Sequence, residues 1–492
     1  MDDRRYALAI RSVTQLWAWT VPVLFLVLVL LGLIMRVNQA GIINADADLF
    51  YAVMTLHGLG MAGTAFVAGL AGVTYLLARY VRVNLVIAWT MYVLTVLGVF
   101  GLVIACLIGR FGPGWYLLYP LPFLANGAWP DWSLGLAVLS LIVLGVAWLL
   151  GQVDLFRALV ARYGLTNALA WQYFGKQSAD RVEIPPIVLI SAAACLVPGI
   201  LTTLDGAVLL MLYLFKWFSP SLGFDPLLFK NMVFLWGHTL VNITMYLGLA
   251  MVYELLPNYT GRPWKTNVVV ALSWNAVLVL VLFAFFHHLY MDFAQPVSLQ
   301  YIGQVASYLS AVPATVVTVF GVIGQVYRSG MQWRFVPLCF CLGIVGWVIG
   351  GFAAVVDSTI AVNSAFHNTL WVPAHFHTYF IAGYILMLWG FLYEFSGSAR
   401  ERLAKAGLWL LVAGAYGFLF MFYLGGALGV PRRFADYSSI PIASLATISE
   451  RIAFIASVFI VLLIIGLLFV FGVIYAGLAN GSLSNKTASS GS

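Results

Sequence analysis

Long apolar stretches recur along the whole chain and are separated by short segments that hold most of the charged residues. A helix that crosses the hydrocarbon core of a bilayer needs about 20 apolar residues in succession. Windows of that length predict twelve membrane spans, at about 14–36, 50–78, 84–109, 132–151, 186–217, 228–256, 266–292, 305–327, 335–357, 371–396, 407–430 and 450–479. The pattern therefore predicts an all-α integral membrane protein built as a twelve-transmembrane-helix bundle.

The spans follow one another closely, so we expect a single domain over residues 1–480. The polar residues 481–492 are expected to form a disordered tail. The fifth span contains Pro198 and Asp205, which predicts a kinked or broken helix there.

Composition excludes a soluble protein, because apolar residues make up 63% of the chain and charged residues only 8%. A soluble domain has roughly 25% charged residues. The net charge of +7 arises from basic residues in short loops, so the expected surroundings are membrane lipid and no nucleic acid partner is predicted. With the N-terminus inside, 17 basic residues lie on the inner side and 7 on the outer side. The positive-inside rule therefore places both termini in the cytoplasm.

The chain has seven histidines, and each lies in or at the end of an apolar run: His57, His238, His287, His288, His367, His375 and His377. The predicted topology places all of them at similar depth in the outer half of the membrane. A lone histidine in a span is often a satisfied core residue, but a whole layer of them indicates metal binding or proton movement. We interpret the layer as a redox site.

Within this layer, His375 and His377 lie two residues apart, so on a helix they point about 200° from each other. One helix then offers an imidazole to each of two neighbours. His57 matches the depth of His377, and the small Gly58 beside it is expected to leave room for a flat macrocycle. The pair is suited to bis-histidine ligation of a low-spin haem.

The adjacent His287 and His288 together with His238 would give three imidazoles, a ligand set for copper or iron. The alternative is a packed polar pair near the headgroups. The four cysteines lie in apolar segments and are interpreted as small buried side chains. Since the chain has no CxxCH motif, covalent c-type haem is not expected, and any such electron carrier would belong to a separate subunit.

Six motifs now resemble, in order, the catalytic subunit (subunit I) of the haem–copper oxidase superfamily. They are Asp225-Pro226-Leu227-Leu228, Trp236-Gly237-His238, His287-His288, His367-Asn368-Thr369, Trp371-Val372-Pro373-Ala374-His375-Phe376-His377 and Pro431-Arg432-Arg433-Phe434-Ala435-Asp436-Tyr437. Three segments look most similar to the B-type branch: Thr55-Leu56-His57-Gly58, His367-Asn368-Thr369 and Trp371-Val372-Pro373. The resemblance implies that branch and the twelve-helix fold of subunit I.

The resemblance also implies a role for each motif residue. His57 and His377 would ligate the low-spin haem, and His375 would ligate the high-spin haem. His238, His287 and His288 would hold the distal metal. His367 would lie near the haem propionates, with which Arg432 and Arg433 would pair; an arginine pair also suits paired carboxylates on chemical grounds.

One position departs from the oxygen-reducing members, which the resemblance leads us to expect to carry a tyrosine one turn after the first distal histidine. Asn242 stands there, and Val281 occupies the alternative tyrosine position. Asparagine cannot supply an electron, although it can donate a hydrogen bond to a bound atom. We therefore predict a catalytic subunit that reduces nitric oxide to nitrous oxide, as in oxidase-like nitric oxide reductases. The alternative is a terminal oxidase that reduces dioxygen to water with electrons from cytochrome c or quinol.

The predicted cofactors are two haems, expected to be b-type, and one copper ion, with non-haem iron as the alternative. Three neutral imidazoles without a carboxylate suit copper better. The expected partner is a smaller subunit II that receives electrons at a cytochrome c or dinuclear copper site, and the expected location is a prokaryotic inner membrane. Protons would arrive along spans six and eight, past Glu254, Tyr253, Thr244, Ser307, Ser310, Thr315 and Thr318, unless these hydroxyls bond only their own helices.

Overall fold

The structure is a computed structural model that describes residues 2–175 and 181–489. Twelve of the described helical segments are long and apolar enough to cross a membrane, which confirms the predicted spans. The long helices are α1 (Asp3–Gln39), α2 (Ala47–Leu77), α3 (Leu85–Val103), α4 (Asp131–Tyr163), α7 (Val197–Phe218), α8 (Pro226–Leu255), α10 (Val268–Ala284), α11 (Val297–Val326), α12 (Phe335–Asp357), α15 (Ile385–Ser396), α16 (Glu401–Ala427) and α17 (Ala443–Ser489).

Short helices complete the spans or lie in the connections between them. The α-helical ones are α5 (Leu165–Ala168), α6 (Pro186–Leu189), α9 (Pro257–Thr260), α13 (Ile360–Phe366) and α14 (Trp371–His377). The 3₁₀ segments are η2 (Leu121–Phe123), η3 (Trp171–Tyr173), η5 (Phe285–Leu289) and η7 (Tyr437–Ser439), and the π-helical segments are η1 (Ile104–Ile108), η4 (Ile190–Leu196) and η6 (Thr378–Tyr384).

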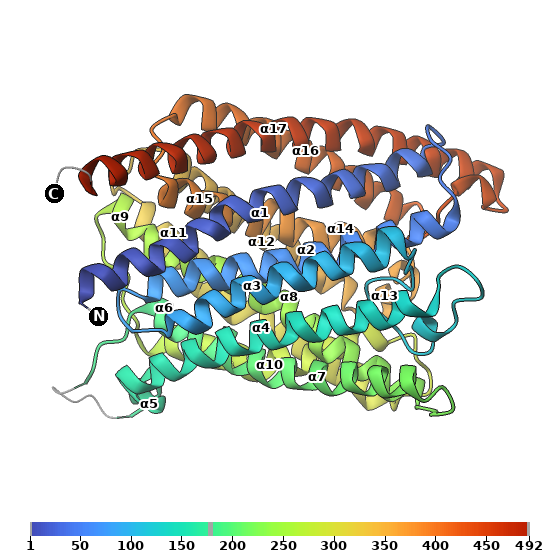
Figure 1. The fold of residues 1–492 in the computed structure, drawn as a ribbon, viewed down its shortest axis with the longest axis horizontal. Coiled ribbons are helices and arrows are strands. Elements are labelled where there is room, and N and C mark those ends of the chain that lie inside the picture. The colour runs from blue at the N-terminus through green and yellow to red at the C-terminus, as the bar shows by residue number, and fades with distance from the viewer. Residues whose placement is uncertain (1, 176–180, 490–492) are drawn as a thin grey trace.

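The long helices run along one common direction, and the start of α1 lies at the same end of the bundle as the end of α17 (Figure 1). An even number of spans requires this arrangement. The predicted single domain and the predicted disordered tail stay predictions. Of the tail, α17 is drawn as helix as far as Ser489, and residues 490–492 lie outside the described part.

Interruptions of regular helix occur close to the histidines. The 3₁₀ segment η5 carries His287 and His288, and the π-helical η6 begins directly after His377. A π-helical segment is rare and often lies at a functional site, whereas a 3₁₀ turn is frequent at the end of a helix, here the end of α10. In the fifth span, the π-helical η4 ends two residues before Pro198, so the predicted irregularity there is confirmed.

Small residues bring α12 against the histidine-bearing span. A Cβ on Gly346 would lie 2.0 Å from the carbonyl oxygen of Ala382 in η6, and one on Gly350 would lie 2.9 Å from the ring of Tyr379. The two spans therefore meet through their backbones, which is typical of helix pairs in membranes. This contact positions the end of α12 beside α14.

Candidate metal centre

The imidazole rings of His57 on α2 and His377 on α14 lie side by side. Their centroids are 6.4 Å apart, and the ring planes differ by 21°. A metal ion between the rings would make two metal–nitrogen bonds of about 2 Å each. The remaining distance is the separation of each ring centroid from its own nitrogen. The pair could therefore hold one metal ion between its two imidazoles.

Backbone carbonyls fix both rings of this pair. The Nδ1 atom of His57 lies 2.7 Å from the carbonyl oxygen of Leu28, and that of His377 lies 2.6 Å from the carbonyl oxygen of Pro373. A carbonyl only accepts, so each Nδ1 carries the hydrogen and donates it. The Nε2 atoms are thereby left as the bare nitrogens, which is the usual state of a ligating histidine.

The two glycines near this pair, Gly58 and Gly32, make room for neighbouring side chains. A Cβ on Gly58 would lie 2.6 Å from the Cβ of Trp115, so Gly58 makes room for a tryptophan, and the expected space for a macrocycle beside it is wrong. Gly32 on α1 makes room for His57 itself, since its Cβ would lie 2.9 Å from the imidazole ring.

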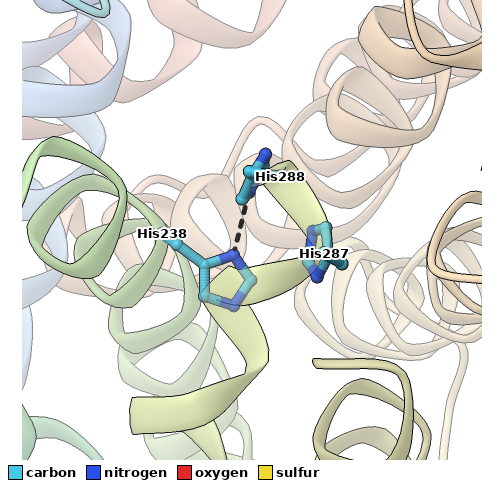
Figure 2. A group of neighbouring side chains, drawn as sticks. All are labelled: His238, His287 and His288. Carbon is cyan, nitrogen blue, oxygen red and sulfur yellow. Dashed lines mark hydrogen bonds between the residues drawn. The ribbon is translucent and has the colours of Figure 1, made fainter. Parts of the chain in front are cut away.

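The other three predicted ligands converge. His238 comes from α8, and His287 and His288 come from η5, with the three rings gathered around one point (Figure 2). One nitrogen from each residue lies within 4.8 Å of the others, and Nδ1 of His238 is 3.1 Å from Nε2 of His288. Two nitrogens bound to one ion at about 2 Å would be separated by about 3 Å. The predicted three-imidazole set therefore has the geometry of a metal site.

Side chains, rather than backbone carbonyls, orient this second set. Nδ1 of His287 lies 3.0 Å from Oγ of Ser307, whose hydroxyl donates in turn to the carbonyl oxygen of Gly303 at 2.6 Å. The serine oxygen therefore accepts from Nδ1–H, and Nε2 of His287 is left bare for a metal. The ring of Phe234 stacks on His288, with centroids 4.7 Å apart.

Asn242 completes the surroundings of His238. Its Nδ2 atom lies 2.9 Å from Nε2 of His238 and 2.9 Å from the backbone carbonyl oxygen of the same residue. In this arrangement the amide donates to Nε2, and Nδ1 holds the ring hydrogen. Once Nδ1 binds a metal, Nε2 must carry the hydrogen instead, and a half-turn of the amide presents its carbonyl as the acceptor. The amide can therefore serve both states of the histidine.

His375 points away from His377, as the spacing predicted. Its Nδ1 atom lies 3.3 Å from Oδ2 of Asp357, the last residue of α12, and both side chains are almost fully buried. One short helix thus presents one imidazole to α2 and another toward α12. Sequence reasoning did not identify Asp357, although a carboxylate at the end of an apolar span is itself unusual.

The predicted anion-binding residues lie in the loops outside the spans. Burial and the neighbouring Arg433 lower the pKa of Arg432 to about 9, while Asp357 acts in the opposite direction. The Nε atom of Arg432 is buried and lacks a hydrogen-bond partner within the described chain. The guanidinium of Arg433 lies 4.1 Å from the ring centroid of Tyr116. A half-buried arginine pair, with one buried donor that lacks a partner within the described chain, fits the carboxylates of a haem.

His367 lies near the same arginines. Its Nδ1 is 3.1 Å from Oδ1 of Asn363, and burial together with the positive charges of Arg432, Lys230 and Arg433 lowers its pKa to about 4. The ring is therefore neutral at physiological pH. The role expected for His367 beside the haem propionates stays a prediction.

Some of the side chains considered for proton supply contact another helix, and others bond only within their own helix. Tyr253 and Thr318 do meet across α8 and α11, with their oxygens 3.1 Å apart. Thr244 donates to the carbonyl oxygen of Leu240, and Ser310 donates to the carbonyl oxygen of Ser307. Each hydroxyl is thus bonded within its own helix, as the alternative to a proton path expects. Tyr80 donates to both carboxylate oxygens of Glu254, at 3.0 and 3.2 Å.

Within the described residues, a bundle of candidate membrane helices thus holds one facing histidine pair and one three-histidine cluster that could bind a metal ion. The chain matches the family model described as cytochrome c and quinol oxidase polypeptide I over residues 12–459. It therefore belongs to this family, the subunit I family of the haem–copper oxidases, and the predicted family is confirmed.

Individual relatives agree with this assignment. The chain is 27% identical over 427 residues to a probable cytochrome c oxidase subunit 1 of Bradyrhizobium diazoefficiens, covering 82% of the chain and 62% of the relative. It is 27% identical over 320 residues to cytochrome c oxidase subunit 1 of Thermus thermophilus, covering 60% of the chain and 56% of the relative. The matched part thus spans about three fifths of these relatives.

A solved structure shows the same fold. The structure of a heme-copper terminal oxidase dimer, determined by cryo-electron microscopy, superposes with a TM-score of 0.77 and covers 96% of this chain and 84% of its own. The two sequences are 21% identical, so the similarity concerns the fold alone.

Proposed function

We propose that this chain is the catalytic subunit of a membrane nitric oxide reductase. The reaction joins two molecules of nitric oxide with two electrons and two protons to give one nitrous oxide and one water. His57 and His377 would hold the low-spin haem, and His375 the high-spin haem. When bound, the high-spin haem and the distal metal would supply the two electrons.

The observation that carries this proposal is Asn242, one helical turn from His238 and in contact with its outer nitrogen. In the oxygen-reducing members that the sequence resembles, a tyrosine in this place supplies an electron and a proton. An amide supplies neither, so splitting dioxygen would lack one local electron source. Coupling nitric oxide needs only two electrons, and the amide remains able to hydrogen-bond a nitrogen or oxygen atom.

The metal proposed for the three-histidine set is copper. The ligand group consists of His238, His287 and His288, and each offers a neutral nitrogen. Imidazole sites without a carboxylate suit copper better than non-haem iron, which remains the alternative. The two haems are proposed to be b-type.

A second candidate function is reduction of dioxygen to water. It is favoured by the relatives, which are named as cytochrome c oxidase subunit 1. For either reaction we propose a prokaryotic inner membrane with both termini in the cytoplasm. A smaller subunit II would bring electrons from a cytochrome c or dinuclear copper site.

Turnover of the purified, reduced complex separates the two functions. Nitric oxide and dioxygen are supplied in separate assays, and nitrous oxide formation and dioxygen consumption are measured. We expect fast nitrous oxide formation and slow dioxygen consumption. Fast dioxygen consumption with negligible nitrous oxide would overturn the proposal, and metal analysis that finds no copper would overturn the choice of metal.

The variant Asn242→Tyr tests whether this residue decides the substrate. We expect a changed ratio of the two activities with both haems still bound, measured by their absorption spectra. Equal activity of the variant and the natural chain toward both gases would show that Asn242 is not the discriminating residue.

A further inference from the structure

Asp357 is a buried carboxylate whose position the preceding reaction does not explain. It ends α12, its side chain is 6% exposed, and its Oδ2 atom lies 3.3 Å from Nδ1 of His375. Its other oxygen, Oδ1, has no hydrogen-bond partner within the described chain. A buried carboxylate is costly unless it is paired, so this side chain requires a partner of opposite polarity.

His375 supplies that partner from the other side. Its Nδ1 atom is also buried and makes no well-formed hydrogen bond among the described residues; the groups near it are the Asp357 carboxylate and the backbone of Val372. If Nε2 of His375 binds iron, Nδ1 carries the ring hydrogen and must donate it. The nearby Oδ2 is an acceptor at a distance that a small tilt of the ring closes to a normal hydrogen bond.

The surrounding backbone keeps the two groups together. Gly346 and Gly350 bring α12 against the span that follows α14, and Asn363 donates its Nδ2 to the backbone carbonyl of Asp357 at 2.7 Å. Arg432 lies close enough to Asp357 for the two charges to interact, so it offsets part of the cost of the buried carboxylate.

We infer that Asp357 is the positioning residue for the ligand of the high-spin haem, through a carboxylate–imidazole hydrogen bond to Nδ1 of His375. The inference rests on the proposed ligation of that haem by His375. An anionic acceptor draws the ring hydrogen more strongly than a carbonyl does and raises the basicity of the ligand. Asp357 therefore strengthens the iron–nitrogen bond and lowers the reduction potential of the reactive haem.

The low-spin pair provides an internal reference. His57 and His377 donate their Nδ1 hydrogens to the neutral carbonyls of Leu28 and Pro373. Only His375 faces a carboxylate among these three. A change at Asp357 should consequently alter the high-spin haem and leave the low-spin haem as it was.

The test compares Asp357→Asn, Asp357→Ala and Asp357→Glu in the complete complex. The readouts are the iron–histidine stretching band of the reduced high-spin haem by resonance Raman and the midpoint potentials of both haems. We expect the band to fall in frequency from the natural chain to Asn and further to Ala, with partial recovery in Glu. The high-spin potential should rise in the same order, and the low-spin potential should stay unchanged. Asp131→Asn, a carboxylate of α4 that accepts a bond from Trp217, is the matched control and should shift neither quantity.

A second measurement covers the case in which the Asp357 variants do not assemble. In His375→Gly, free imidazole or 1-methylimidazole replaces the ligand while Asp357 is kept. Imidazole offers a hydrogen to the carboxylate and 1-methylimidazole does not, so the band with imidazole should be higher by more than the extra mass of the methyl group explains. A difference that the mass alone explains, or a natural-chain band that all three Asp357 variants leave in place, would overturn this inference alone. Absence of any iron–histidine band from the natural chain would instead overturn the assignment of His375 and the proposed function with it.

Discussion

The two histidine sites of this protein are held in place by different parts of the chain. In the pair formed by His57 and His377, each ring donates to a backbone carbonyl. In the cluster of His238, His287 and His288, the outer partners are the side chains of Asn242 and Ser307. His375 belongs with the second group, since it faces the carboxylate of Asp357.

This difference separates a fixed site from an adjustable one. A backbone carbonyl keeps its place and its chemistry whatever side chain the residue carries. A side-chain partner can be neutral, charged or absent after a single substitution, and the basicity of the ligand changes with it. The pair is thus suited to a constant task such as electron transfer, and the cluster is the place where the chemistry of the family can vary.

The largest expected effects come from removing the ligands on α14 one at a time. His377→Ala should abolish the low-spin haem signal, and His375→Ala should abolish the high-spin signal while the low-spin spectrum remains. Either change should lower turnover by more than about 100-fold, which exceeds the usual cost of losing an outer partner. Optical spectra and haem content check this, and loss of both haems together in each variant would contradict two separate sites.

The next effect concerns the acceptor at His238. Asn242→Leu keeps the branched shape of the side chain but removes both the donor and the acceptor. We expect metal affinity or turnover to fall by about 10–100-fold, with both haems retained. Titration of the metal content under a chelator measures the affinity, and an unchanged titration would show that His238 needs no outer partner.

A smaller effect is expected at Ser307, because a water molecule can replace its hydroxyl. Ser307→Ala should lower metal affinity or turnover by about 10-fold, at the lower end of the usual range. Ser310→Ala is the matched control, since that hydroxyl bonds only the backbone of its own helix. Equal losses in the two variants would assign the effect to α11 rather than to His287.

The smallest effect is expected where the partner is a carbonyl. Leu28→Val shortens a buried side chain and should cost about 1 kcal/mol of stability, yet the carbonyl that orients His57 remains. The low-spin haem spectrum should be unchanged while thermal unfolding begins at a lower temperature. A shifted low-spin spectrum would show that the pair also depends on side chains.

Residues that belong to a local pattern were predictable from the sequence. Apolar windows located the twelve spans, and the spacing of His375 and His377 determined that they face different neighbours. The three-histidine cluster followed from motifs whose order and composition are specific.

Partners on other helices were not predictable in this way. Ser307 was expected on a proton path, and in the structure its hydroxyl contacts His287. The sequence did not indicate this contact, because it depends on how α11 packs against η5. Gly58 was expected to face a macrocycle and faces Trp115, which arrives from a loop. Asp357 went unnoticed, since nothing in α12 alone indicates that its last residue meets His375.

The contacts of Asn242 lie within a single helical turn, since its amide reaches only the ring and the carbonyl of His238 among the hydrogen bonds recorded for the described chain. A position of this kind can change in evolution without a compensating change on another helix. One nucleotide separates the codons of asparagine and tyrosine, so a lineage could exchange one for the other in a single mutational step. If Asn242 decides the substrate, the substrate could then change while the six metal-ligating histidines stay in place.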